Sequence, residues 1–120
     1  MTPQEINEAI ALRRGWRPPL PADTHVDRYK WFTPDGYRAF LSNWAEDDGL
    51  AFKELWPEII KASKFGAFLY SDINGHTIWE TGGSVKDEKK LTKVSRLASL
   101  AICLAWLALH PLPEIKEEKK

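Results

Sequence analysis

The sequence has little of what marks several large classes of protein. Its 120 residues include a single cysteine, and 17 basic residues balance 17 acidic ones. One thiol excludes a framework of internal disulfides and suits a reducing compartment. A balanced charge lacks the surplus of Lys and Arg that duplex-DNA binders carry. We therefore expect no strong binding to duplex nucleic acid.

Long apolar runs are also missing. The uncharged segment at positions 97–109 has 13 residues, whereas a membrane-spanning helix needs about 20. The first 15 residues include acidic side chains and no apolar stretch of the kind found in signal peptides. These absences predict a protein of the cytoplasm with no membrane contact.

The motifs of common enzyme classes are absent as well. No serine lies in a Gly-x-Ser-x-Gly elbow, and no Cys and His spacing matches a zinc site. Asp23, His25 and Asp27 alternate, so neighbouring pairs among them could share one face of an extended segment and hold a metal. A metal site needs a further ligand, and we predict a hydrated loop without metal or cofactor. A small metal- or carboxylate-dependent enzyme is the alternative.

What the sequence does contain is a series of well-signalled elements. Thr2 and Glu5 match a capping box at the start of a helix. Residues 29–41 predict two short strands around a Pro-Asp-Gly turn. Residues 45–63 predict a second helix, which Pro57 should kink or divide because proline removes a backbone donor.

A hairpin and a final helix follow. Asn74 and Gly75 favour a tight turn between two strands in residues 65–83. Alternation along these strands predicts one aromatic face and one aliphatic face, formed by Phe68, Tyr70 and Trp79 and by Leu69 and Ile78 respectively. A charged link at residues 84–90 should lead to a last helix over residues 95–109.

Together these elements predict an α+β fold in a single domain over residues 1–111. We expect a small antiparallel sheet packed between helices, an α-β-α layered sandwich. Residues 112–120 are rich in Lys and Glu and predict a charged C-terminal tail.

The last helix is apolar on nearly every side, so it must be covered from more than one direction. We expect a leucine stripe to pack against the sheet, made of Leu97, Leu100, Leu104 and Leu107. The side turned away from the sheet then supplies candidates for a homodimer interface, namely Ser99, Cys103, Trp106 and His110. Cover by the chain's own helices is the other explanation, and the sequence favours it over a second copy.

A second group of residues has the chemistry to bind an anion or a nucleotide. Arginine pairs with phosphate, tryptophan stacks on bases, and paired glycines expose backbone amides. The candidates are Arg13, Arg14, Trp16, Arg17, Gly82 and Gly83. Each has an ordinary alternative, since cations suit a helix C-terminus and glycines suit a turn without the lysine of a P-loop.

Three segments carry a family resemblance. Ala101, Ile102, Cys103, Ala105 and Leu107 match a helix pattern Ala-Ile-Cys-x-Ala-x-Leu. With residues 47–59 and 75–83, they resemble the phage ABA sandwich domain family over most of residues 1–110. The resemblance implies helix–sheet–helix layering and a phage origin, and hence the cytoplasm of a bacterial host. It implies no reaction, because the family has no established activity.

Six tryptophans are many for 120 residues. A core of this size cannot hide all of them, and exposed aromatic side chains are typical of binding interfaces. With no catalytic motif present, we expect a non-enzymatic binding module. As a phage accessory protein it would bind a host or defence-system protein, or sequester a small nucleotide signal.

Overall fold

The computed structural model describes residues 2–20, 30–82 and 88–111 of the 120-residue chain. In chain order the described elements are α1 (Pro3–Arg13), β1 (Trp31–Phe32), β2 (Arg38–Ala39), α2 (Asp48–Glu54), α3 (Trp56–Ala62), β3 (Ala67–Asp72), β4 (Gly75–Glu80), β5 (Lys89–Lys90) and α4 (Ala98–Leu109). The predicted α+β class is confirmed. Within the described residues, no helix is both long enough and apolar enough to cross a membrane.

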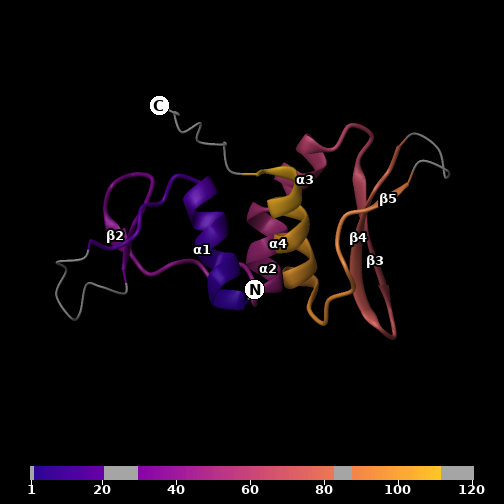
Figure 1. Cartoon of the computed structure of the whole chain (residues 1–120), viewed down its shortest axis with the longest axis horizontal. Coiled ribbons are helices and arrows are strands. Elements are labelled where there is room, and N and C mark those ends of the chain that lie inside the picture. Colours follow the sequence, from indigo (N-terminus) through magenta and orange to yellow (C-terminus); the bar gives the residue numbers. More distant parts are fainter. Residues whose placement is uncertain (1, 21–29, 83–87, 112–120) are drawn as a thin grey trace, which may run out of the picture.

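Two small antiparallel sheets lie on either side of the helices (Figure 1). Strands β3, β4 and β5 form one sheet, and β1 pairs with β2 in the other. Helix α4 lies beside β4 and also packs on α1, α2 and α3. The helices therefore lie between the two sheets, whereas the sequence predicted one sheet between helices.

The first helix begins as its sequence predicts. The Thr2 side chain accepts a hydrogen bond from the Glu5 amide, and the Glu5 carboxylate accepts one from the Thr2 amide. Pro3 occupies the first turn, where its missing donor costs nothing. Gly15 follows the last turn with a φ of +95°, a conformation that glycine adopts without strain. The chain then leaves the helix toward Trp16.

The second predicted helix is divided in two, as Pro57 indicated. Asp47 caps α2 by accepting the Leu50 amide at 3.0 Å. The helix ends at Leu55, and α3 begins at once with Pro57 in its first turn. The break changes the direction of the chain without an intervening loop.

The hairpin has the predicted faces but a different turn. Asp72 pairs with Gly75, so the two loop residues are Ile73 and Asn74 rather than Asn74 and Gly75. The Asp72 carboxylate accepts the Asn74 amide at 2.8 Å and closes the turn. This moves the pairing by two residues, which leaves every side chain on its predicted face. Phe68 accordingly lies opposite Trp79.

The charged link predicted at residues 84–90 is partly wrong. Lys89 and Lys90 form β5, which pairs with Glu80 and Trp79 of β4. Beyond β5 the chain stays beside β4, where Ser95 and His76 exchange backbone hydrogen bonds. The local charge pattern predicts a solvated link, and it could not indicate that these residues pair with β4. Residues 83–87 lie outside the described part of the chain.

Helix α4 is turned about its axis relative to the prediction. The side carrying Ala98, Ala101 and Ala105 is buried among the elements around it, because small side chains allow close approach. The predicted leucine stripe lies on the remaining side. Leu97 is exposed, and the other three leucines are only partly covered, namely Leu100, Leu104 and Leu107. The expectation that this stripe is the buried side of the helix is therefore wrong.

Both ends of α4 are completed by distant residues. The helix has no side-chain cap of its own, and it has no acidic residue in its first turn and no basic residue in its last. Asp48 of α2 accepts the Ser99 amide at 2.9 Å. At the other end, the Arg13 guanidinium donates to the carbonyl of His110 at 2.7 Å. Neighbouring helices thus satisfy backbone groups that α4 leaves open.

The hydrophobic core joins the helices to the inner face of the larger sheet. Four helices, strand β4 and the segment before α2 each contribute to it. The fully buried large side chains include Ile10, Trp44, Leu55, Ile59, Ile78 and Ile102. Removal of these apolar surfaces from water is the main force holding the layers together.

Gly75 provides a test of the hairpin. A Cβ at this position would lie 2.5 Å from the Ser95 carbonyl oxygen, and the residue has a φ of +133°. Gly75→Ala should therefore lower the free energy of unfolding by about 3 kcal/mol, measured by urea denaturation. Gly49→Ala is the matched control, because its Cβ would lie 3.6 Å from its nearest neighbour. That variant should be at least as stable as the parent, and equal stability of the two variants would contradict the close approach at Gly75.

Candidate functional site

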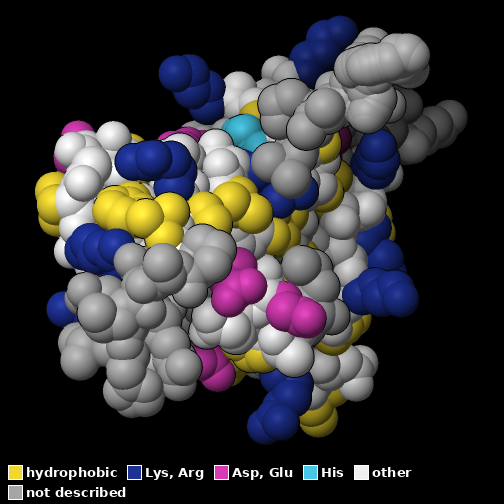
Figure 2. Space-filling view, turned by 60° about the vertical axis from the view of Figure 1, so that its left-hand side comes forward, with side chains coloured by type: hydrophobic (Ala, Val, Ile, Leu, Met, Phe, Trp, Pro, Cys, Tyr) yellow, Lys and Arg dark blue, Asp and Glu magenta, His cyan; other side chains and the backbone are white. Residues whose placement is uncertain are grey.

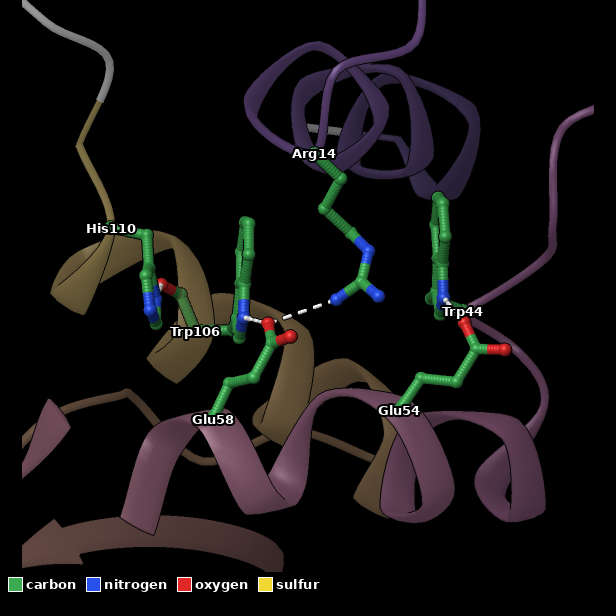
Figure 3. Close-up of polar contacts among 6 residues, drawn as sticks. All are labelled: Arg14, Trp44, Glu54, Glu58, Trp106 and His110. Atoms are coloured by element: carbon green, nitrogen blue, oxygen red, sulfur yellow. Dashed lines mark hydrogen bonds and ion pairs between the residues drawn. The ribbon is translucent and has the colours of Figure 1, made fainter. Parts of the chain in front are cut away.

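Glu58 of α3 joins three helices. Its Oε1 atom accepts a hydrogen bond of 2.7 Å from the Trp106 indole N–H of α4 and one of 2.9 Å from the Arg14 guanidinium after α1 (Figure 3). Trp106 is 3% exposed, so its N–H needs a partner within the protein. The Glu58 carboxylate supplies that partner and forms an ion pair with Arg14.

A second tryptophan and glutamate pair lies beside the first. The Trp44 indole donates to Glu54 Oε1 at 2.8 Å, and Glu54 precedes Glu58 by four residues across the break between α2 and α3. The Arg14 guanidinium carbon lies 5.9 Å from the centre of the Trp44 ring. Arg14 therefore lies between the two pairs and is held by both (Figure 3).

Arg13 and His110 form the other wall of the site. The Arg13 guanidinium donates to the carbonyls of His110 and Ala9, at 2.7 and 2.9 Å. The His110 ring stacks on Trp106 with centres 4.4 Å apart. Its Nδ1 atom donates a hydrogen bond to the Trp106 carbonyl at 2.9 Å. Both side chains are thus fixed in orientation.

These residues surround an open cleft of about 560 Å³. Its lining consists of Arg13, Arg14, Glu58, Lys61, Ala62, Trp106 and His110. A neighbouring hollow shares Arg13, Trp106 and His110 with the cleft, so the concave surface continues toward Leu109 and Pro111. Three permanent cations face one carboxylate here, although the whole chain is neutral.

The cations of the cleft retain unused hydrogen-bond donors. A guanidinium has five N–H bonds, and the described contacts engage two groups of Arg13 and one of Arg14. Lys61 is exposed and forms no ion pair within the described part of the chain. The cleft can therefore offer several fixed donors and one mobile ammonium to an anion.

The predicted ligand-binding residues fall into separate places. Arg13 and Arg14 line the cleft together. Trp16 packs edge-on against Trp44, with ring centres 6.2 Å apart, and Arg17 lies over Phe32. Gly82 follows β4, outside the residues that line the cleft, and Gly83 lies outside the described residues.

Three of the four predicted dimer-interface residues are buried by the chain itself. Ser99, Cys103 and Trp106 are buried within the chain itself, and the Ser99 hydroxyl donates to the Ala45 carbonyl at 2.8 Å. His110 is half-buried and faces the cleft. The chain's own helices therefore cover Ser99, Cys103 and Trp106, which is the cover that the sequence favoured. The homodimer itself stays a prediction.

No metal site is found in the described part of the chain, where no three His, Cys, Asp or Glu side chains gather in a way that could hold an ion. The predicted hydrated loop of Asp23, His25 and Asp27 lies outside the described residues.

Sequence reasoning missed Glu58 and Lys61. Their spacing of three residues places them near one another on α3, but many surface helices show such a pattern. Only the distant contacts of Glu58, 44 and 48 residues away, distinguish this pair.

Comparison with known proteins finds no matching family profile, curated protein or solved structure for this chain. The resemblance to the phage ABA sandwich family stays a prediction. Function must be inferred from the cleft itself.

Glu58 allows a direct test of the cluster. Glu58→Ala removes the acceptor of a buried indole N–H and should lower the free energy of unfolding by about 1–2 kcal/mol. Glu58→Gln keeps an oxygen acceptor and loses only a charge that is partly screened by solvent, so it should cost less than about 1 kcal/mol. Urea denaturation of both variants measures the difference. Equal losses would contradict the role of Glu58 as the hydrogen-bond acceptor.

Cys103 is predicted to be unreactive in the folded protein. Burial raises the pKa of its thiol from 9.0 to about 12, because the thiolate loses its hydration. At pH 8 a disulfide reagent should modify it only after urea is added. Above pH 9 the thiol ionises in the unfolded chain but stays protonated in the folded one, so this group lowers stability as pH rises toward 12. Fast modification of native protein would contradict the burial.

Proposed function

We propose that this protein is a non-enzymatic binding module whose cleft takes a small phosphate-bearing molecule such as a nucleotide. The observation that carries the proposal is the local concentration of Arg13, Arg14 and Lys61 around one concave surface of a chain without net charge. Charge-assisted hydrogen bonds to phosphate are among the strongest polar contacts that a protein surface makes.

The cleft is already arranged for such a ligand. Arg13 is held by two carbonyls, and Arg14 is held by Glu58 and by the Trp44 ring. Binding therefore needs little ordering of these two side chains, and fixed donors lose less free energy to immobilisation than mobile ones. Lys61 can then close on the anion from the rim.

The same geometry argues for binding rather than turnover. Glu58 is the one carboxylate that lines the cleft, and it already accepts hydrogen bonds from Arg14 and Trp106. The Trp106 side chain is buried. A residue so engaged supports structure and charge balance. The phage resemblance then suggests what the binding achieves, which is sequestration of a small host nucleotide signal.

Lys61 provides the test of this proposal. Isothermal titration with adenosine monophosphate and with inorganic pyrophosphate should show binding that weakens at high salt. Lys61→Gln should reduce the affinity about five- to tenfold, through the loss of a charge-assisted contact of the size expected for exposed phosphate pairs. The variant should fold normally, because Lys61 is exposed.

Lys53→Gln is the matched control. Lys53 is an exposed lysine of α2 that does not line the cleft, and its replacement changes the net charge equally. The affinity of Lys53→Gln for both ligands should equal that of the parent protein. Equal weakening by both variants would indicate nonspecific attraction of anions and contradict a site in the cleft, and so would an absence of binding to both ligands at millimolar concentration.

A further inference from the structure

The small sheet at the other side of the molecule carries an unusual row of side chains. Phe32 of β1 pairs directly with Arg38 of β2, and on its other side it forms an antiparallel bridge with Arg17. Residues directly opposite one another in a sheet project from the same face. The two guanidinium carbons accordingly lie 5.1 Å (Arg17) and 4.3 Å (Arg38) from the centre of the Phe32 ring.

The pattern continues into the next row. Lys30 and Phe40 are two residues away from Phe32 and Arg38, so alternation places them on the same face. The Lys30 ammonium lies 5.4 Å from the centre of the Phe40 ring, which agrees with this placement. We call the surface formed by Arg17, Lys30, Phe32, Arg38 and Phe40 the cation–aromatic face.

The opposite face of the same strands is buried. Trp31 belongs to the hydrophobic core, and Thr33, which follows β1, is buried too. The cation–aromatic face is therefore the outer one, and in Figure 2 the side of the molecule that carries α1 and this sheet shows hydrophobic side chains bordered by Lys and Arg. By its definition, the face combines three cations with two rings.

One aromatic side chain of this face is largely open to solvent. Phe40, which follows β2, is 65% exposed. Large rings that a protein leaves in water beside cations are costly to keep uncovered and are typical of recognition surfaces. Arg17 and Arg38 lie on opposite sides of β1 and are separated by two strand spacings of about 5 Å each.

We propose that the cation–aromatic face binds single-stranded nucleic acid. Arg17, Lys30 and Arg38 would pair with phosphates along the backbone, while an unpaired base stacks on Phe40. Charge complementarity selects a polyanion, and the exposed ring of Phe40 favours one with free bases. A duplex keeps its bases stacked inside, and an acidic peptide offers carboxylates without flat rings. This surface shares no residue with the cleft, so the two proposals are independent.

The test uses the full chain and a fluorescently labelled 12-nucleotide oligothymidylate, followed by fluorescence anisotropy. Binding should weaken with salt, with a slope of log affinity against log salt of about −2 for three phosphate contacts to a single strand. Arg17→Gln and Lys30→Gln should each make that slope shallower by about 0.7. Phe40→Ala should weaken binding about fivefold or more without a comparable change in slope.

Two controls separate this surface from general attraction. Lys53→Gln removes an exposed cation of α2 that belongs neither to the cleft nor to the cation–aromatic face, so it should leave oligonucleotide affinity and slope unchanged. Phe40→Leu keeps an apolar side chain but not the ring, so it should weaken binding nearly as much as Phe40→Ala if stacking is the cause. Circular dichroism of each variant confirms that the fold is retained.

Three results would overturn the proposal. The first is no binding to the oligonucleotide at low salt. The second is equal or tighter binding to a duplex of the same length or to polyglutamate, which would indicate a partner of another kind. The third is binding that is unaffected by Arg17→Gln, Lys30→Gln and Phe40→Ala together, which would place the contact elsewhere on the molecule.

Discussion

The arrangement of the helices depends on one carboxylate that accepts two hydrogen bonds. Glu58 on α3 receives the indole N–H of Trp106 from α4 and the guanidinium of Arg14 after α1. Because a buried indole N–H without a partner is costly, this acceptor fixes where α4 can lie over α3. Arg14 in turn fixes the end of α1. The walls of the cleft follow from these contacts, so the same atoms that hold the fold also form the proposed site.

The break between α2 and α3 matters for the same reason. Glu54 and Glu58 are four residues apart, but they belong to two helices that meet at Leu55. Each glutamate can therefore reach a different tryptophan, Trp44 or Trp106, and leave room between them for Arg14. Pro57 is thus part of the geometry of the cleft, although its side chain does not line it.

Features set by nearest neighbours in the chain could be predicted from the sequence. The capping box of Thr2, the division at Pro57 and the two faces of the hairpin depend on a few adjacent residues each, and all are confirmed. The orientation of α4 could not be predicted, because a helix that is apolar on nearly every side gives no direction in which to face the core. Arg13 and Arg14 could be predicted as anion-binding residues from their charge. Glu58 could not, since its role rests on partners 44 and 48 residues away.

The way in which α4 is capped has a consequence for how the chain folds. Its first turn is completed by Asp48 and its end by Arg13, which are 51 and 97 residues distant from the groups they bind. A short helix without its own caps is marginal in water, so α4 gains its stability on docking rather than before it. Its formation must wait for the closure of loops that span most of the chain, and such contacts slow the approach to the native state. Although α4 is the most apolar helix of the chain, its stability therefore depends on the cooperative folding of the whole domain.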